Sequence, residues 1–278
     1  MATPSAAIPK IIYSLWLQGR DQLPPVVRLN FKRWMALNPD YELKVLDRGD
    51  ADALLRNTGV ALASLTPQAL SDVVRACLLA EVGGIWVDAS GFPIRPLNDW
   101  LPPMVNDVGF FGFEHPTPDR LISSWFLAAS PRHVILREWW NETKRFWSKP
   151  RRLVPGDAPN PVASVSPQSG GATDQFPYFW FHYLFQYLVE SRPEIAALWR
   201  RCPKMPAVSA HRLQYLFLNV QNPTAAAIRQ AAYASPVQKL NWRAPYPLEF
   251  LAALPPLPEM PSPTHTHAVL DILSTAGR

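Results

Sequence analysis

The sequence predicts an α/β fold in which an open, mostly parallel sheet carries helices on both faces. Short apolar runs rich in β-branched residues alternate with helical patterns through the first third of the chain. Strands that alternate with helices in this way are typical of parallel sheets. The 278 residues include 48% hydrophobic and 18% charged residues, which is the composition of a globular chain with a sizeable core.

Each element is predicted from its periodicity and its end signals. The helix over 66–82 is the clearest, because Thr66-Pro67 suits a helix start and Gly83 suits a stop. The expected strands are 10–17, 41–46, 84–87, 107–113 and 123–129. The expected helices are 24–38, 50–57, 66–82, 133–147, 179–190, 194–201 and 224–233.

Composition restricts the function classes. Two cysteines are too few for a disulfide framework and have no paired metal spacing, and Cys77 is expected in the core. Because there is no signal peptide and no apolar run of about 18 residues, we expect a cytoplasmic protein, at most at the inner face of the membrane. A net charge of +5 favours anionic partners, but the absence of a nucleic-acid motif argues against nucleic acid.

The ends of two predicted strands carry candidate site residues. Ligands of open α/β sheets bind beyond the carboxyl ends of the strands, where Trp16 and Asp88 fall. The preceding helix contributes Asp72 and Arg75, which are three residues apart and so share a face. A surface ion pair is the simpler interpretation, but the helix is apolar on nearly every side. We therefore expect this pair near the interior or a cavity.

These residue types suit the chemistry of a nucleotide-activated sugar. A carboxylate accepts hydrogen bonds from hydroxyl groups, and an arginine can bind diphosphate oxygens with two parallel hydrogen bonds. An acid at a strand end can hold a divalent cation that offsets the charge on a leaving diphosphate.

Three stretches of the sequence resemble the capsular polysaccharide synthesis proteins. They are IPKIIYSLWLQG, NPDYELKVLD and LSDVVRACLLAEVGGIWVDAS. These proteins are relatives of retaining glycosyltransferases that carry a DxD motif. The resemblance implies a GT-A type (Rossmann-like) fold with a more helical C-terminal part. It also implies sugar transfer from a UDP- or GDP-linked donor to a bacterial surface glycan or lipid-linked acceptor, assisted by Mn²⁺ or Mg²⁺.

The resemblance assigns roles to individual residues. Trp16 would stack on the nucleotide base, Asp72 and Arg75 would bind the donor sugar and diphosphate, and Asp88 would be the first acid of DxD. Ser90 replaces the second acid and is a poor substitute for it at a hard cation. This leaves weaker metal binding, another ligand from the C-terminal half, or transfer without metal.

The C-terminal half offers further candidates. His182 lies in an aromatic segment that belongs to the resemblance, and it is as plausible a ligand of the diphosphate or metal as it is a core residue. His211 is a weaker candidate. Lys239 and Trp242 would close over the diphosphate, with ordinary packing equally compatible. The predicted donor set is thus Trp16, Asp72, Arg75, Asp88, Ser90, His182, Lys239 and Trp242; the catalytic set is Asp72, Arg75 and Asp88; and the metal set is Asp88, Ser90 and His182.

We expect a single domain over 1–254. Its part 8–100 would bind the nucleotide sugar and 101–254 would close over the acceptor, with a proline-rich tail at 255–278. The Pro/Ser/Gly-rich segment 154–177 is either a lid over the donor or an ordinary connecting loop. The helix over 133–147 either packs on the core or, with the adjacent basic residues Lys149, Arg151 and Arg152, presents a tryptophan-rich surface to anionic membrane.

Two other functions compete with sugar transfer. A nucleotide- or sugar-binding protein with weak catalysis would explain Ser90. A glycoside hydrolase would need two carboxyl groups about 5–10 Å apart, and only Asp72 is an evident partner for Asp88.

Overall fold

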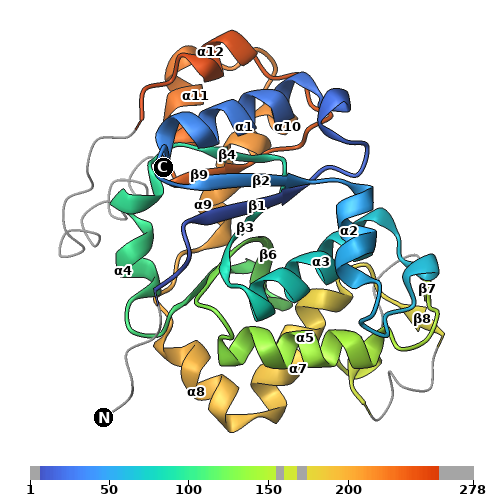
Figure 1. Cartoon of the computed structure of the whole chain (residues 1–278). Helices are drawn as coiled ribbons and strands as arrows, with labels where there is room; N and C mark the ends of the chain where they lie inside the picture. The colour runs from blue at the N-terminus through green and yellow to red at the C-terminus, as the bar shows by residue number, and fades with distance from the viewer. Residues whose placement is uncertain (1–6, 155–159, 168–173, 257–278) are drawn as a thin grey trace.

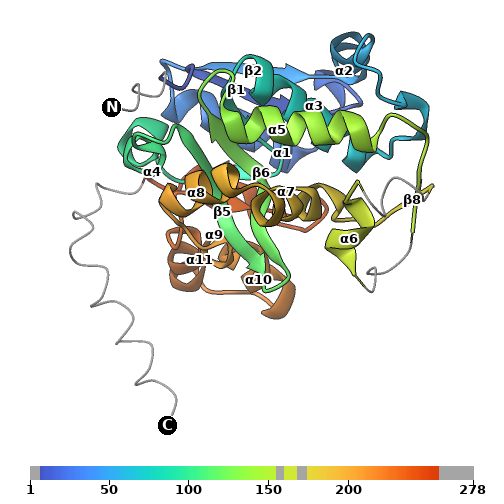
Figure 2. The same ribbon diagram turned by 90° about the horizontal axis from the view of Figure 1, so that it is seen from below.

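The computed structural model describes residues 7–154, 160–167 and 174–256. A five-stranded sheet with the order β2-β1-β3-β6-β5 forms its centre. The strands are β1 (Ile11–Leu15), β2 (Glu42–Leu46), β3 (Gly84–Val87), β5 (Phe110–Thr117) and β6 (Arg120–Ala129). The sheet is open, with β2 (labelled in Figure 1) and β5 (labelled in Figure 2) at its edges.

The predicted α/β class and open sheet are confirmed, but the sheet is mixed. β1 pairs in parallel with both β2 and β3, whereas β6 runs antiparallel to β3 and to β5. β5 and β6 are joined by a short turn, and a hairpin of this kind requires antiparallel neighbours. β6 is therefore the one strand of the central sheet that runs against the others.

One face of the sheet is covered by a layer of amphipathic helices. Tyr13, Trp86 and Leu127 point to this face and are buried against α3 (Pro67–Glu81), which begins at the predicted Thr66 cap. The layer is completed by α2 (Arg48–Leu55), α5 (Val134–Phe146), α7 (Trp180–Ser191) and α8 (Pro193–Arg201). Figures 1 and 2 show α5 beside α3 on this side, and α7 packs against α5 in turn.

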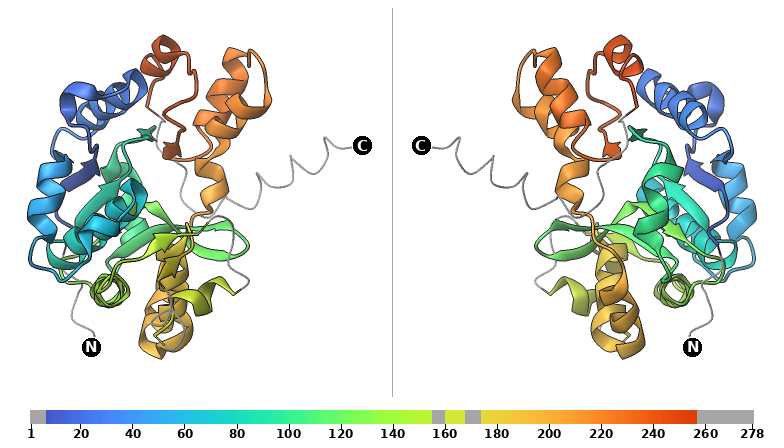
Figure 3. Two further views of the ribbon diagram at one scale, coloured as in Figure 1. Left: turned by 90° about the vertical axis from the view of Figure 1, so that its right-hand side faces the viewer. Right: turned by 90° about the vertical axis from the view of Figure 1, so that its left-hand side faces the viewer.

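The opposite face carries α1 and the C-terminal helices. Ile12, Ile85 and Phe126 point here and pack with Trp34 of α1 (Pro25–Leu37). Further along the chain lie α4 (Leu101–Val105), α9 (Ala207–Ala210), α10 (Arg212–Asn219), α11 (Ala225–Ala232) and α12 (Leu248–Ala252). Figure 3 shows α10 and α11 in orange and α12 in red on the same side of the sheet as α1.

Two short ribbons complete the fold. β4 (Gly91–Pro93) pairs antiparallel with β9 (Val237–Lys239), and β7 (Arg152–Leu153) pairs in parallel with β8 (Gln175–Phe176). The remaining elements are the helix α6 (Pro161–Val165) and the 3₁₀ turns η1 (Arg20–Gln22), η2 (Leu62–Ser64) and η3 (Leu97–Asp99). The β4–β9 ribbon was not predicted, and it joins segments almost 150 residues apart.

Helix α5 packs on the core, as the simpler interpretation holds. Its aromatic residues Trp139, Trp140 and Phe146 are at most 3% exposed, and the following Trp147 is also buried. Arg151 is buried as well and donates to the Phe146 carbonyl oxygen at 2.6 Å. The alternative interpretation, a surface of tryptophans and basic residues that faces the membrane, therefore does not hold for these residues.

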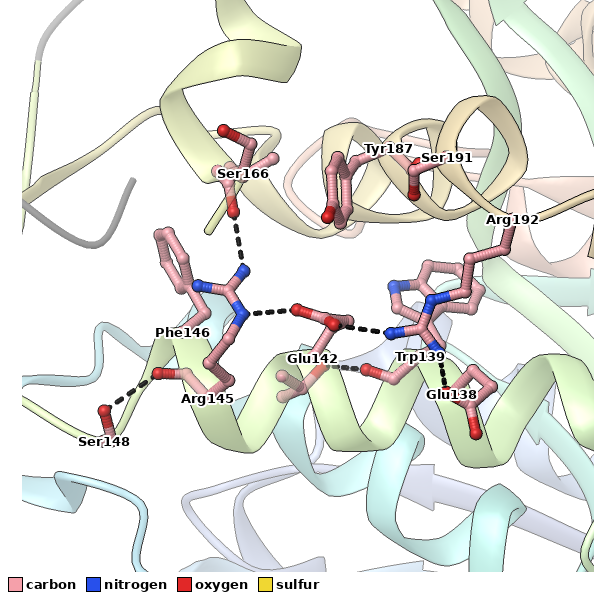
Figure 4. A network of polar contacts seen from close by, with 12 residues as sticks. Glu138, Trp139, Glu142, Arg145, Phe146, Ser148, Ser166, Tyr187, Ser191 and Arg192 are labelled. Atoms are coloured by element: carbon pink, nitrogen blue, oxygen red, sulfur yellow. Dashed lines mark hydrogen bonds and ion pairs between the residues drawn. The ribbon is translucent and has the colours of Figure 1, made fainter. Parts of the chain in front are cut away.

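A network of charged side chains joins α5 to the start of α8 and to α6 (Figure 4). Glu142 accepts a hydrogen bond from Arg192 at 2.8 Å and also pairs with Arg145. Arg192 pairs with Glu138 too, and Arg145 donates to the Val165 carbonyl oxygen at 2.8 Å. We call these four side chains the helix network.

Parts of two expectations fall outside the described residues. The Ser169–Ala172 stretch of the predicted lid lies there, as does the predicted tail from 257 onward. Among the residues that the structure does describe, no helix is both long and apolar enough to cross a membrane.

Candidate active site

A cavity of about 650 Å³ opens at the carboxyl ends of β1 and β3. Since these strands are parallel neighbours, the residues that follow them, Trp16 and Asp88, lie at the same edge of the sheet. All eight residues of the predicted donor set line this cavity, and so does His211. The fold thus brings together residues more than 200 positions apart in sequence.

Helix α3 delivers Asp72 and Arg75 to the cavity. It turns into β3 through Gly83 and Gly84, which have φ values of 72° and 105°. A Cβ atom at position 83 would lie 2.6 Å from the Pro131 backbone nitrogen, so a glycine is required there. The Arg75 guanidinium, only 4% exposed, contacts Asp72 Oδ1 through Nη1 and Asp88 Oδ1 through Nη2, both at 2.9 Å.

Asp88 is the centre of the polar cluster. Its Oδ1 accepts hydrogen bonds from Arg75 and from the Trp86 indole at 3.1 Å. Its Oδ2 accepts a hydrogen bond from Lys239 Nζ at 2.7 Å. Three donors from three elements therefore hold one carboxylate, and we call Asp72, Arg75, Asp88 and Lys239 the cavity cluster.

The β4–β9 ribbon positions Lys239. Lys239 is the register partner of Gly91, and the next residue, Leu240, donates its N–H to the Ser90 carbonyl oxygen at 2.9 Å. The Lys239 ammonium lies within 2.6 Å of Ser90 Oγ as well as 2.7 Å from Asp88. Ser90 is buried and Lys239 is about one-fifth exposed.

The two carboxylates of the cluster have opposite pKa shifts. Burial would raise the pKa of Asp88, but the charges of Lys239 and Arg75 and the hydrogen bonds to the carboxylate lower it to about 2. Burial raises the pKa of Asp72 to about 7, because Arg75 offsets the cost only in part and the charge of Asp88 adds to it. Near neutral pH the cluster therefore holds one firmly ionised carboxylate and one that can gain or lose a proton.

Both histidines of the cavity are held neutral. Burial, with the nearby charges of Arg120 and Arg75, lowers the pKa of His182 to about 3. Burial and Lys239 lower the pKa of His211 to about 4. The buried Nδ1 atoms of both rings lack a hydrogen-bond partner within the described part of the chain. A buried polar atom without a partner is unfavourable, so these atoms are candidates for contact with a ligand.

Two tryptophans form one wall of the cavity. The rings of Trp16 and Trp242 meet edge to face with centroids 5.3 Å apart. The Trp16 indole donates to the Gln22 carbonyl oxygen, which fixes its orientation. Trp242 is 37% exposed, and the Arg243 guanidinium lies over its ring at 4.1 Å.

The contribution of β6 to the cavity was not predicted from the sequence. Because β6 is antiparallel to β3, its first residues lie at the edge where β3 ends, and Asp88 N–H donates to the Trp125 carbonyl oxygen at 2.8 Å. Arg120, Ser123 and Trp125 line the cavity in consequence. No motif marks these residues; only the antiparallel pairing, predictable from a hairpin at 117–120, would have indicated them.

The cavity carries a positive balance. Among the described residues that line it are two carboxylates, Asp72 and Asp88, against four cationic side chains. These are Arg75, Arg120, Lys239 and Arg243. A partly enclosed cavity with excess positive charge, hydroxyl-binding carboxylates and an aromatic wall is suited to an anionic ligand that also carries hydroxyl groups and a ring.

The fold and the cavity thus define an α/β protein with a cavity of positive balance at the ends of its parallel strands. Residues 2–155, more than half of the chain, match the capsular polysaccharide synthesis protein family. The chain belongs to this family. The match includes β1, α3, β3 and three of the four cluster residues, and Lys239 lies outside it.

Curated relatives match about half of the chain. One is "O-glycosyltransferase braB" of Annulohypoxylon truncatum, 27% identical over 158 residues, which cover 50% of this chain and 38% of that protein. Another is "Initiation-specific alpha-1,6-mannosyltransferase" of Schizosaccharomyces pombe, 28% identical over 157 residues, covering 48% and 39%. The match therefore spans less than two fifths of the length of either relative.

Among solved structures, the chain is similar to one described as "PaToxG Glycosyltransferase". The two share 15% sequence identity with a TM-score of 0.45, over 82% of this chain and 79% of that one.

Proposed function

We propose that this protein is a glycosyltransferase that moves a sugar from a UDP- or GDP-linked donor to a bacterial surface glycan, with retention of configuration at the transferred carbon. The observation that carries the proposal is Asp88, which ends a parallel strand and is held by Arg75 and Lys239 in a cavity of positive balance. Family membership and the names of the curated relatives support the same class of reaction.

Each part of the cavity has a role in this reaction. The cationic side chains would bind the diphosphate and stabilise the negative charge that develops on it as the sugar leaves. Asp72 would accept hydrogen bonds from sugar hydroxyl groups, as a carboxylate bonded to Arg75 through one oxygen only can do. Trp16 would stack on the base. Catalysis would then rest on positioning and charge stabilisation.

The acceptor would bind in the second half of the chain. A capsule, exopolysaccharide or lipopolysaccharide precursor is the acceptor that the family implies, and a lipid-linked one would place the reaction at the inner face of the cytoplasmic membrane. Arg120, the β6 serines and Tyr178 also line the cavity, and they would supply polar contacts for a sugar.

The family resemblance also implies Mn²⁺ or Mg²⁺ near Asp88. The predicted set of Asp88, Ser90 and His182 does line one cavity, but it fits a hard cation poorly. It offers a single carboxylate, and the Lys239 ammonium already contacts both Asp88 and Ser90. Within the described ranges, no group of three or more histidine, cysteine or acidic residues is arranged to hold a metal. We assign no step to a metal ion.

One observation favours a glycoside hydrolase as the second candidate. The pKa values of Asp72 and Asp88 are pushed apart, as they are for an acid and a nucleophile. However, both oxygens of Asp88 already accept hydrogen bonds from the protein, which suits a binding role better than attack on a sugar. Hydrolysis of an unactivated glycan without nucleotide would favour this candidate.

A panel of UDP- and GDP-sugars tests the proposal, with nucleotide release as the readout. We expect one donor to be turned over, and Asp88→Asn and Asp72→Asn each to lower turnover by about 10- to 100-fold or more, because each removes a charged hydrogen-bonding partner. Asp52→Asn is a matched control, since the Asp52 side chain on α2 is 44% exposed and, within the described part of the chain, forms its ion pair with Arg48.

Circular dichroism would show that each variant is folded. The proposal fails if both cavity variants keep wild-type turnover, or if no donor is either bound or turned over. Binding of UDP or GDP without any turnover would instead support a nucleotide-binding protein with weak catalysis.

A further inference from the structure

The contact between Lys239 and Ser90 carries a consequence for how the leaving group is stabilised. Lys239 Nζ lies 2.7 Å from Asp88 Oδ2 and 2.6 Å from Ser90 Oγ, so the ammonium bridges the two positions that correspond to the acids of DxD. The β4–β9 ribbon holds this arrangement in register, through the pairing of Gly91 with Lys239 and the hydrogen bond from Leu240 to Ser90. The bridge is therefore built into the backbone rather than formed by a free surface lysine.

A divalent cation and this ammonium compete for the same place. A cation bound by Asp88 would need Oδ2, because Oδ1 already accepts from Arg75 and from Trp86. Oδ2 is the atom that Lys239 occupies. A metal would have to displace an ion pair that is only about one-quarter exposed, and would receive a neutral hydroxyl as its second ligand.

We propose that Lys239 replaces the divalent cation, so that this protein transfers sugar without a metal ion. The inference rests on the proposed function and specifies its mechanism. An ammonium has three donors, and Asp88 and Ser90 accept two of them, which leaves the third for a phosphoryl oxygen of the donor. Ser90 then has a positive reason to be a small hydroxyl residue, since a second carboxylate would hold the ammonium away from the phosphate.

The charge balance of the cavity agrees with this role. A divalent cation contributes two positive charges, and Lys239 contributes one. Arg120 and Arg243 also line the cavity, and no described carboxylate other than Asp119 contacts either of them. Together with Lys239 they supply positive charge equal to or above that of the metal ion.

The step balances without any further reactant. The bond between C1 of the sugar and the oxygen of the β-phosphoryl group breaks, and its electron pair stays on that oxygen. The acceptor hydroxyl oxygen bonds to C1, and its proton passes to the departing diphosphate. The Lys239 ammonium keeps its protons throughout and stabilises the new negative charge.

Turnover in EDTA and in Mn²⁺ is the first test. Wild-type nucleotide release should be the same within about twofold in both, and Lys239→Met should lower it by about 100- to 1,000-fold in both, as removal of one charge-stabilising donor does. Lys239→Arg should keep part of the activity. Lys44→Met is the matched control, since Lys44 lies on β2 and does not line the cavity. Loss of wild-type turnover in EDTA with recovery in Mn²⁺ would overturn the proposal.

A binding experiment separates this proposal from the proposed function. Electron paramagnetic resonance of free Mn²⁺, titrated with protein and UDP or GDP, should show no uptake of Mn²⁺ beyond what the nucleotide takes alone. Uptake by the wild-type protein that disappears in Asp88→Asn would overturn the metal-free assignment even if turnover supports a glycosyltransferase. If neither nucleotide binds in EDTA or in Mn²⁺, the proposed function itself fails, and this inference with it.

Discussion

Two clusters of charged side chains in this protein have similar members but differ in how completely their polar atoms are paired. The helix network joins two glutamates and two arginines across α5 and α8, and the cavity cluster joins two aspartates to Arg75 and Lys239. Both include a carboxylate less than 15% exposed, Glu142 in one and Asp72 in the other. Burial alone therefore does not distinguish a structural cluster from a functional one.

The clusters differ in whether their buried polar atoms have hydrogen-bond partners. In the helix network Glu142 uses both oxygens on arginines, and Arg145 uses a further N–H on a backbone carbonyl (Figure 4). Around the cavity cluster, buried Nδ1 of His182, Nδ1 of His211 and Nε of Arg75 have no partner among the described residues, and burial raises the pKa of Asp72 to about 7. A network whose buried polar atoms all have hydrogen-bond partners stabilises the fold. A network that leaves buried polar atoms without partners at a cavity wall has the arrangement expected of a ligand-binding site.

The largest effect is expected from a substitution that breaks the helix network. Glu142→Gln leaves Arg145 and Arg192 without their shared carboxylate, and removal of one partner from a largely buried pair costs about 3 kcal/mol or more. We expect the free energy of unfolding in urea to fall by about that amount, while nucleotide release at 25 °C stays within about twofold of wild type, because the network lies outside the cavity.

Glu190→Gln is the control for this variant, since Glu190 is on the exposed side of α7 and, among the described residues, accepts a hydrogen bond from Gln186 alone. The distinction between the clusters would be lost if Glu142→Gln lowered turnover at a temperature where it remains folded.

The comparison also shows what the sequence could predict. Asp72, Arg75 and Asp88 were predicted to share a site because their signals are local: spacing on one helix, two glycines, and a short strand that ends in an acid. Local signals depend on backbone geometry that is encoded within about 20 residues. The helices and strands of the first 90 residues were predicted to within a few residues for the same reason.

The remaining parts depend on pairing between distant segments. The resemblance placed Lys239 in the donor set, but its contact with Asp88 was not predicted. It depends on the pairing of β9 with β4, and a three-residue strand has no periodicity to reveal it. Arg120 and Ser123 reach the cavity only because β6 is antiparallel to β3. The membrane-facing interpretation of α5 failed because one broad apolar face looks the same in sequence whether a core or a lipid surface covers it.

An intermediate effect is expected in the pH dependence of stability, through Asp72 of the cavity cluster. The pKa of Asp72 is raised to about 7, so the native state keeps a proton between about pH 4 and 7 that the unfolded state has lost. The stability contributed by this group therefore falls as pH rises through that range. Because Asp72→Asn does not titrate, the free energy of unfolding of this variant should increase relative to that of wild type as pH rises from 4 to 8. Urea unfolding at several pH values measures the difference.

Donor binding should show the opposite trend. In the proposed function the ionised form of Asp72 accepts hydrogen bonds from the sugar, so affinity for the sugar nucleotide should rise about tenfold from pH 6 to pH 8 and level off above that range. Calorimetry on Asp72→Asn should give weaker binding that is flat across the same range, because the diphosphate diester of a sugar nucleotide does not titrate there. A pH dependence that survives in Asp72→Asn would assign the titration to another group.

The smallest expected effect would show whether the pair of Trp16 and Trp242 stabilises the fold or binds the ligand. An edge-to-face pair with centroids 5.3 Å apart contributes about 0.5–1.5 kcal/mol beyond the area it buries. If the pair serves the fold, a double-mutant cycle with Trp16→Ala and Trp242→Ala should show that coupling in the free energy of unfolding. If it serves the ligand, as the partial exposure of Trp242 and the position of Trp16 in the cavity indicate, the coupling should appear in the affinity for UDP or GDP and be near zero in urea unfolding. We expect the second result, and coupling confined to stability would place these tryptophans with the helix network.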